Sequence, residues 1–416
     1  ILTEMRNFLN GFTLLSVFSA LFSGSFNALS QDVLEERSPY NIHRTHSKIQ
    51  ISVGSWGEIE FYPIILEPSD FYLLTSEDFK QSSTKTVWRF DANDGTAVQK
   101  ILINSGLSPE LASRLVRPQF LSKNATINLM EITPPEEVIL GLTQAQRAQL
   151  YPQLMPKNTI SPFFQPFTLP NGGIDAVSHR PTGLPPDQID RIRKLSFTLG
   201  STTRLSDINL LMGKAMNDDE RLRILKTLSR NSSLSTRLKL HPGTNLQKLT
   251  SYWECGGKNK DIGPILESVI RTSGIDHIDL VHLLPPTPRK LLHTYPSPSG
   301  EGLGDDLPDC FWTSFAFFAD TPPDRHLDFV GHIFNERYEL AEKPLQFGDL
   351  VLFTKDGPTD WIHACNYIAG NLVFTKNGMS MGRPWTISPL NDVAQSYLSG
   401  QEITISFFRL KPGYQR

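Results

Sequence analysis

Two proline-rich stretches constrain the fold of this chain more than any other feature of its sequence. Prolines recur through residues 152–186 and again through 285–308, and proline is excluded from helix interiors and from the central strands of sheets. With 416 residues, the chain is also too long for one ordinary hydrophobic core. We therefore expect a region over 46–151, a second region over 187–284 and a C-terminal domain over 300–416.

The composition is that of a globular chain without a strong overall charge. Hydrophobic residues make up 39% and charged residues 20%, and the net charge is −3. These values exclude a largely disordered chain and provide no general attraction for nucleic acid, so no nucleic-acid partner is expected. The 3 cysteines cannot build a disulfide framework. No cofactor is expected.

The first 30 residues have the pattern of a secretory signal peptide. A short basic start at Met5-Arg6 precedes the apolar run Phe12–Phe22, and small and polar residues lead to Ser30. The apolar run is too short to span a membrane as a helix. The pattern predicts a signal peptide over 1–30, cleaved after Ser30, and an exported protein, periplasmic or extracellular, without a membrane span. The alternative is a buried N-terminal helix.

Strand signals dominate the start of the 46–151 region. Apolar residues alternate with polar ones from 49 to 53, and β-type composition continues at 59–61, Phe71–Leu74 and Thr86–Phe90. Short runs of this kind, separated by glycine and proline, predict short strands. The region over 46–151 is therefore expected to be β-rich, with a few short helices.

Helix signals follow and dominate the region over 187–284. Ser108 before a proline and the capping-box pattern that begins at Thr143 each predict a helix start. Apolar residues at helical spacing then occupy 205–215, 217–228 and 264–274. The middle region is therefore expected to be helical.

Cys255 is the one cysteine in this helical region. It lies between Trp253 and two glycines. One interpretation is a reactive thiol beside flexible backbone. The other, which we favour, is a small buried residue at a helix end, because free cysteine is among the most buried residue types. Trp253 is expected in the core.

Cys310 stands where a helix is expected to begin. Asp309 is a good N-cap residue, and the apolar run Phe311–Phe318 follows Cys310. A thiol in the first turn of a helix lies near unpaired backbone N–H groups and the positive end of the helix dipole, which favour the thiolate. The same N–H groups can stabilise an oxyanion. Cys310 is thus a candidate nucleophile, and Asp309 marks a candidate oxyanion or substrate-binding position.

His363 is the candidate general base that a cysteine nucleophile needs within hydrogen-bond reach. It lies in an expected strand over 361–368, which follows a turn and apolar strand at Phe347–Phe353. Ala369–Asn371 has the composition of a hairpin turn, and an apolar return strand follows. The pattern predicts that His363 lies near the start of a buried β-hairpin.

Strand alternation places further polar groups near His363. It puts Cys365 and Tyr367 on the same face as His363. On the return strand, Thr375 and Asn377 share a face. A polar side chain there would orient the imidazole, as the third member of a catalytic triad does.

The elements of this C-terminal segment follow one another in a characteristic order. Asp309-Cys310 begins a helix, Gly348-Asp349-Leu350 precedes a strand, His363 opens the next strand, and a Gly370-Asn371 hairpin leads to Thr375 and Asn377. This order resembles that of the papain-like cell-wall cysteine peptidases of the NlpC-type superfamily, over about residues 308–414. The resemblance implies an α+β papain-like domain that hydrolyses peptide or amide bonds in peptidoglycan, with Cys310 as nucleophile and His363 as base.

The sequence departs from the family pattern close to the candidate site. Phe311-Trp312 replaces the Ser-Gly that usually follows the cysteine, and Thr375 replaces a third polar residue that is often histidine. Asn377 is chemically the better orienter and resembles the asparagine of papain, so we prefer it to Thr375. Tyr295 is a candidate for the substrate-binding tyrosine that the family often places upstream of the nucleophile.

Cys365 allows three interpretations. In an oxidising compartment it could form a disulfide with Cys310, which would silence or gate the nucleophile. We favour a small buried residue that replaces a family glycine or alanine. A zinc site from Cys310, His363 and Cys365 lacks the usual ligand spacing, so no metal is expected. His326 and His332 are expected on the surface.

These observations predict an exported α+β cysteine hydrolase whose C-terminal papain-like domain follows a β-rich and a helical region. Its expected partner is peptidoglycan or another cell-envelope peptide. One alternative is a catalytically inactive cell-envelope binding protein on the same fold. Another is an amidase or acyltransferase that acts on a different, lipid or protein, amide.

Overall fold

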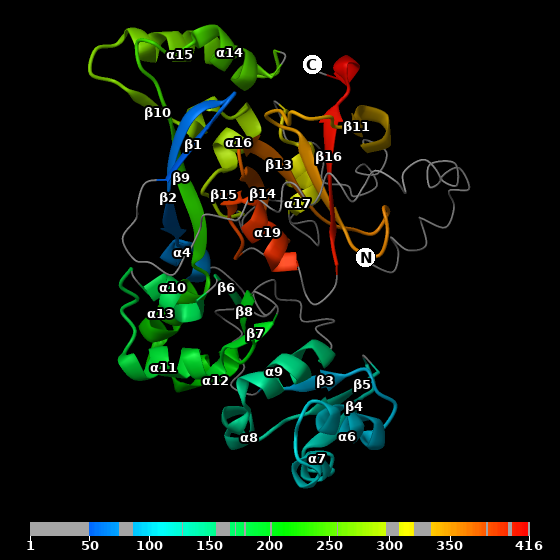
Figure 1. The fold of residues 1–416 in the computed structure, drawn as a ribbon. Helices are drawn as coiled ribbons and strands as arrows, with labels where there is room; N and C mark the ends of the chain where they lie inside the picture. Colours follow the sequence, from blue (N-terminus) through cyan, green and yellow to red (C-terminus); the bar gives the residue numbers. More distant parts are fainter. Residues whose placement is uncertain are drawn as a thin grey trace.

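The structure, a computed structural model, describes residues 50–74, 86–126, 128–154, 167–170, 172–178, 180–199, 202–255, 257–296, 308–319, 334–379, 382–397 and 402–414. Helices and several antiparallel sheets make up this part of the chain, in agreement with the α+β prediction (Figure 1). The expected signal peptide, His326 and His332 lie outside the described residues. No described helix combines the length and apolar character needed to cross a membrane.

The C-terminal part is built on a six-stranded antiparallel sheet. Its strands lie in the order β11-β16-β12-β13-β14-β15. Their bounds are β11 (Tyr338–Leu340), β12 (Leu350–Thr354), β13 (Trp361–Ala369), β14 (Leu372–Lys376), β15 (Trp385–Pro389) and β16 (Thr404–Leu410). Every residue of β12 and β14 is buried, which is typical of strands covered on both faces.

Two helices cover opposite faces of the central hairpin. Helix α19 (Leu390–Tyr397) packs with the face that carries Cys365. Helix α17 (Cys310–Phe315) packs with the face that carries Ala364. Hydrogen bonds from the Asn366 amide to the Ser314 carbonyl (3.2 Å) and from the Trp385 indole to the Thr313 hydroxyl (2.9 Å) hold α17 against the sheet. The N-terminus of α17 is thereby fixed beside β13.

A four-stranded antiparallel sheet joins the N-terminal strands to the middle of the chain. Its order is β1 (Gln50–Gly54), β2 (Gly57–Leu66), β9 (Asn231–Lys239) and β10 (His277–Asp279). Helices α14 (Leu246–Glu254) and α15 (Ile262–Arg271) pack with it in a core that extends to the six-stranded sheet. Strand β9 was not predicted, and its pairing with β2 along nine residues places the two expected regions in one sheet.

The four-stranded sheet also meets the outer edge of β15. The Ile387 N–H donates to the Ser233 hydroxyl of β9 (3.2 Å), and that hydroxyl donates to the Ile387 carbonyl (3.3 Å). At Trp385, the backbone N–H donates to the Thr294 carbonyl (3.1 Å), and the carbonyl accepts from the His293 N–H (2.8 Å). These bonds join β15 to segments outside the C-terminal part.

The remaining described residues share one hydrophobic core in the lower half of Figure 1. This part contains two three-stranded sheets, made of β3 (Trp88–Phe90), β5 (Leu129–Ile132) and β4 (Leu121–Asn124), and of β6 (Phe167–Leu169), β8 (Thr202–Leu205) and β7 (Phe197–Leu199). The helices are α4 (Asp70–Leu74), α6 (Gly95–Asn104), α7 (Pro109–Leu115), α8 (Glu136–Gly141), α9 (Gln144–Leu150), α10 (Gly173–Ser178), α11 (Pro186–Leu195), α12 (Ile208–Lys214) and α13 (Asp218–Leu228). Short helical turns elsewhere are η2 (Tyr151–Gln153), η3 (Leu280–Leu283), α16 (Pro286–Leu291) and η4 (Pro412–Tyr414).

One local prediction was wrong in this part of the chain. Phe71–Leu74, expected as a strand, belongs to helix α4, where the Leu73 N–H donates to the Ser69 carbonyl. A short apolar run carries no periodicity that separates strand from helix. The proline-rich stretch over 152–186, which separates two of the expected regions, contributes β6 and α10, and Ile174 and Val177 are buried in the core.

The predicted helix starts are confirmed. Ser108 caps α7, Asn217 caps α13, and Thr143 forms a complete capping box at α9. In each case the side-chain oxygen accepts one of the backbone N–H groups that the first turn leaves unpaired.

Candidate active site

The candidate catalytic residues gather at one end of the six-stranded sheet. In the strand register, Phe353 of β12 lies opposite His363 of β13, and Lys376 of β14 lies opposite Trp385 of β15. These pairs mark the end of the sheet that is remote from the β13–β14 hairpin. Cys310 reaches the same end, because the backbone N–H of Ala364, the residue after His363, hydrogen-bonds to its thiol.

A chain of hydrogen bonds fixes the tautomer of His363. Thr375 Oγ1 lies 3.0 Å from His363 Nε2 and donates its proton to Asn377 Oδ1, also at 3.0 Å. Because a hydroxyl has one proton, Thr375 must accept from a protonated Nε2. Nδ1 is then unprotonated, and it is buried without a hydrogen-bond partner. The imidazole therefore holds an unused basic nitrogen.

The orienting residue differs from the one we preferred. Asn377 does not contact His363 directly, and Thr375 lies between them. The two polar residues thus act in series rather than as alternatives. Asn377 takes the hydroxyl proton of Thr375 and so forces the threonine oxygen to face the imidazole.

Aromatic side chains enclose the His363 ring. Tyr397 of α19 stacks on it with the ring centroids 4.5 Å apart, and Phe353 packs edge-on at 5.1 Å. His363 has no exposed surface. Burial lowers the pKa of His363 to about 3, because a positive charge on the ring would be enclosed away from water. The imidazole is neutral at physiological pH, as a general base must be.

Cys310 is also buried and neutral. Only 5% of the surface of Cys310 is exposed to solvent. Burial, and then the charge of Asp309, raises the pKa of the Cys310 thiol to about 12, although the Ala364 N–H and Lys376 act in the opposite direction. The expectation of a thiolate favoured by the helix start therefore does not describe this state.

Cys310 and His363 are neighbours but are not hydrogen-bonded to each other. Cys310 begins the helix on the Ala364 face, whereas His363 points to the α19 face with Tyr397. Cys310 nevertheless lies near Cys365 and Tyr397 on that face. Burial raises the pKa of both groups, and a negative charge on Cys310 would raise it further. The structure thus brings the thiol to the His363 end of β13 without completing a Cys–His contact.

The first turn of α17 is already occupied by its own cap. Asp309 Oδ1 accepts from the Trp312 N–H at 2.7 Å, and the Phe311 N–H also stabilises this carboxylate. Burial raises the pKa of Asp309 despite these bonds. The N–H groups that we expected to hold an oxyanion therefore bind Asp309, so the aspartate has a structural role at this position.

Lys376 is a functional candidate that sequence reasoning missed. It has no exposed surface, its ammonium group donates to the Gly378 carbonyl at 2.6 Å, and it lies 5.7 Å from the centre of the Trp385 ring. Burial lowers the pKa of Lys376 to about 7, while Cys310 and Asp309 act to raise it. A buried cation thus lies beside the thiol. The sequence gives no signal for it, because a lysine in a strand is normally expected at the surface.

Tyr295 lies away from the thiol. Its hydroxyl donates to the Ser229 carbonyl at 3.0 Å, and its ring packs against the core of the lower half of the molecule. Its hydroxyl also interacts with Asn231 and with the charge of Arg383. A substrate-binding role for Tyr295 stays a prediction.

The remaining interpretations of the cysteines can also be compared with the structure. Cys310, Cys365 and Cys255 are all free thiols. Cys365 is completely buried in the core beneath α19, as a small core residue would be. Within the described ranges, no group of three or more His, Cys, Asp or Glu side chains is arranged to hold a metal ion.

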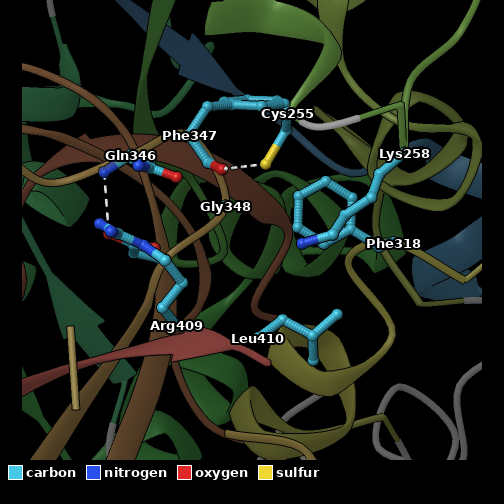
Figure 2. A pocket seen from close by; sticks show the side chains of 9 residues that line it. Cys255, Lys258, Phe318, Gln346, Phe347, Gly348, Arg409 and Leu410 are labelled. Atoms are coloured by element: carbon cyan, nitrogen blue, oxygen red, sulfur yellow. Dashed lines mark hydrogen bonds and ion pairs between the residues drawn. The ribbon is translucent and has the colours of Figure 1, made fainter. Parts of the chain in front are cut away.

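A separate pocket surrounds Cys255 at the other end of β12. Figure 2 shows the Cys255 thiol directed at the Phe347 carbonyl, 3.0 Å away, with Lys258 over the Phe318 ring. Cys255 ends helix α14 with a φ of 48° and is half-buried. Trp253 is buried in the core. These positions agree with a residue at a helix end and place Cys255 outside the candidate site.

Known proteins give no independent guide to this site. Comparisons with protein-family models, with curated proteins and with solved structures found no match to this chain. The function must therefore be inferred from the chemistry of the residues themselves.

Proposed function

We propose that this chain is an exported cysteine hydrolase that cleaves peptide or amide bonds, with peptidoglycan stem peptides as the first candidate substrate. The observation that carries the proposal is the His363 tautomer. Thr375 and Asn377 hold Nε2 protonated, and Nδ1 remains a buried acceptor without a partner. A cysteine nucleophile requires a free imidazole nitrogen as its base, and the Cys310 thiol is held by the backbone of Ala364, the residue next to His363.

The proposed reaction uses the thiol and the imidazole in sequence. Nδ1 of His363 takes the proton of Cys310 as the sulfur attacks the carbonyl carbon of the amide. The C–N bond then breaks, and the imidazolium donates the same proton to the departing amine. Water, deprotonated by Nδ1, hydrolyses the thioester and restores the thiol. The other ring proton stays on Nε2 throughout, and its hydrogen bond to Thr375 Oγ1 keeps the ring in place.

Lys376 supports this proposal by its charge. Two neutral groups in a buried site must pass through a thiolate and an imidazolium, and this separation of charge is costly away from water. The ammonium group of Lys376 acts on the Cys310 sulfur, so it would stabilise the thiolate and the oxyanion. It would replace the backbone N–H groups that Asp309 occupies.

The test is digestion of purified sacculi and of soluble stem peptides by the full mature chain. Cys310→Ala and His363→Ala are each expected to reduce product release roughly 10³-fold or more. Cys255→Ala is the matched control, since this cysteine lies in the pocket of Figure 2 and should leave the rate unchanged. Normal turnover by the Cys310 or His363 variant would overturn the mechanism.

A second candidate function is a non-catalytic binding protein on the same fold. The specific observation in its favour is that Cys310 and His363 are both buried and neutral and make no direct hydrogen bond. This function predicts retention on sacculi that survives Cys310→Ala, with no released fragments from either protein. Release of fragments by the unmodified chain alone would decide for the hydrolase.

A further inference from the structure

Arg383 extends the polar surroundings of the candidate site toward the rest of the molecule. It precedes β15 by two positions and so lies at the same end of the sheet as His363 and Lys376. Its Nη1 donates to Asn231 Oδ1 at 3.0 Å. The Asn231 amide in turn donates to the Gly382 carbonyl (2.9 Å) and to the Ser229 carbonyl (2.7 Å). Asn231 therefore fixes the guanidinium without neutralising it.

Arg383 has no counter-ion in the part of the chain that the structure describes. Arg230 and Arg409 do have one: Arg230 pairs with Glu67 at 2.7 Å, and Arg409 pairs with Asp349 at 2.7 Å. The fully buried Arg147 instead donates to two backbone carbonyls, those of Ile139 and Leu142. Protein atoms crowd Arg383, yet solvent reaches part of it. An enclosed cation without a carboxylate is costly, and partial solvent access leaves room for an anion to approach.

A second arginine lies in the same surroundings. Arg204 of β8 is half-buried, and its Nε is buried without a hydrogen-bond partner. Its charge acts on Arg383 and opposes it. Within the described residues, Arg204 also has no ion pair. Two like charges held near each other without an anion between them would gain most from a ligand of opposite charge.

These arginines adjoin the reacting groups. The hydroxyls of Tyr397 and Tyr295 both interact with the Arg383 charge, and the Tyr397 ring stacks directly on His363. Arg383 also acts on Lys376, which lies beside Cys310. Arg383 thus lies in the surroundings of the groups that the proposed mechanism uses, where one substrate could offer an anionic group to the arginine and an amide to Cys310.

We propose that Arg383 and Arg204 form an anion subsite that binds a free carboxylate of the substrate peptide, next to the bond that Cys310 attacks. This inference rests on the proposed function and names the substrate class: peptides with a free carboxylate beside the scissile amide. A guanidinium matches a carboxylate with two parallel hydrogen bonds, and a pair with this geometry selects an ionised carboxylate over its neutral amide.

The test is a binding measurement that needs no turnover. The full chain carrying Cys310→Ala is titrated calorimetrically with soluble stem peptides whose carboxylates are free, and with the same peptides after conversion to methylamides. The free acids are expected to bind roughly 10-fold more tightly or better. Adding Arg383→Gln should bring the ratio of the two dissociation constants to about one, with little change for the methylamides, and adding Arg204→Gln should reduce the ratio.

The matched control is Arg117→Gln, because Arg117 is exposed and far along the chain from the site. It should keep the full preference for the free acids. Arg383→Lys retains the charge and should keep part of the preference, which provides a second reading if the glutamine variant does not fold. Equal binding of acids and methylamides by the parent chain, binding of neither, or a preference that survives Arg383→Gln would overturn the subsite.

This outcome is separate from that of the proposed function. A chain that never hydrolyses stem peptides but prefers the free acids through Arg383 would retain the subsite and lose the hydrolase. A chain that hydrolyses acids and methylamides equally well would retain the hydrolase and lose the subsite.

Discussion

The side chain of His363 has one nitrogen satisfied and the other unused. Its Nε2 is held by Thr375, which is held by Asn377, and the Nδ1 lone pair is enclosed without a partner. A buried acceptor without a hydrogen bond is uncommon in a folded protein, and it costs free energy that better packing could avoid. In the mechanism we propose, this nitrogen takes the proton of Cys310.

Thr375→Val tests this orientation. Valine has nearly the same shape but leaves the Nε2 proton without an acceptor, so the ring can adopt the other tautomer, in which Nδ1 is no longer basic. The rate of peptide hydrolysis should fall roughly 100-fold, and the free energy of unfolding should fall by about 1–3 kcal/mol. Thr375→Ser keeps the oxygen and should retain most of the activity. Nitrogen NMR shifts of His363 that do not differ between wild type and Thr375→Val would contradict the tautomer assignment.

The acid stability of the fold should depend on His363. Its pKa is about 3 in the folded chain against an ordinary value of 6.5, so between these values the unfolded chain binds the proton. The stability that neutral His363 provides is present above about pH 6.5 and is lost as the pH falls toward 3. Between pH 7 and pH 4, the wild type should lose about 3 kcal/mol more than His363→Gln.

Urea unfolding of both proteins at several pH values measures this difference directly. Burial raises the pKa of Asp207 and of Asp392 to about 6. The folded state therefore favours the protonated form of these two carboxyls, so their effect is to increase the free energy of unfolding as the pH falls. Both carboxyls are present in wild type and variant, so their effects cancel in the comparison. Parallel pH profiles for the two proteins would show that His363 is not enclosed as described.

Lys376 should control the reactivity of Cys310. Its positive charge lowers the pKa of the thiol, so Lys376→Met should raise that pKa and slow alkylation of Cys310 at a given pH. Lys123→Met is the matched control, because Lys123 is exposed. Mass spectrometry after timed alkylation measures Cys310 separately from the other two cysteines. An unchanged rate in Lys376→Met would remove this lysine from the proposed mechanism.

The positions of Cys310 and His363 in the fold could be predicted because each lies near the start of a secondary-structure element. Asp309 marks the helix start, and strand alternation determines the face of His363. The preference for Asn377 over Thr375 could not be settled from chemistry alone, since it depends on which oxygen lies at 3.0 Å from Nε2. The proposed roles of Lys376 and Arg383 carry no sequence pattern, because they depend on how the folded chain surrounds these side chains.

At the scale of the secondary-structure element, helix α17 has its first turn closed by Asp309. The cap uses the N–H groups that a free helix start would offer to a ligand. The helix thereby gains a stable beginning, and its dipole acts on an internal carboxylate rather than on a substrate. In the mechanism we propose, the charged side chain of Lys376 favours the thiolate instead.

Asp309 variants should separate its two effects. Asp309→Ala removes the cap and should lower the free energy of unfolding by about 1 kcal/mol. Asp309→Asn keeps an accepting oxygen and should preserve most of the stability, but it removes a negative charge that raises the pKa of Cys310. Alkylation of Cys310 should therefore be faster in Asp309→Asn than in wild type. Denaturant unfolding and timed alkylation together measure both effects, and slower alkylation would contradict the charge assignment.

Helix starts could be predicted because the residues at the start itself determine them. A strand whose formation depends on pairing with a distant strand could not be predicted. Caps at Ser108, Thr143 and Asn217 are local signals, and all three are confirmed. Strand β9 has serine, arginine and lysine at its less buried positions, and it lies among helix signals. Its identity as a strand depends on β2, which is far away in the sequence.

For the whole molecule, the four-stranded sheet makes the N-terminal strands inseparable from the middle of the chain. Strand β2 pairs with β9 along its length, and the core between this sheet and the helices α14 and α15 also receives Phe347 and Trp385 of the C-terminal part. The proline-rich stretches mark changes in the path of the chain, and hydrophobic contacts extend across both of them.

A shortened chain tests this connection. A protein of residues 187–416 lacks β2, which leaves one side of β9 unpaired and exposes Leu238 and Leu234. We expect it to lose the cooperative unfolding transition that a protein of residues 46–416 shows by circular dichroism in urea. A cooperative transition in the shorter protein would show that residues 187–416 fold independently of the first strands.

The bonds along β15 bear on how this protein avoids association with other copies through its largest sheet. An open outer strand offers a row of N–H donors that can pair with another chain. Here the Trp385 N–H is taken by Thr294 and the Ile387 N–H by Ser233. The next outward position is Pro389, which has no N–H to offer. This side of the sheet therefore presents no free donor along β15, and edge-to-edge aggregation is blocked there by the chain itself.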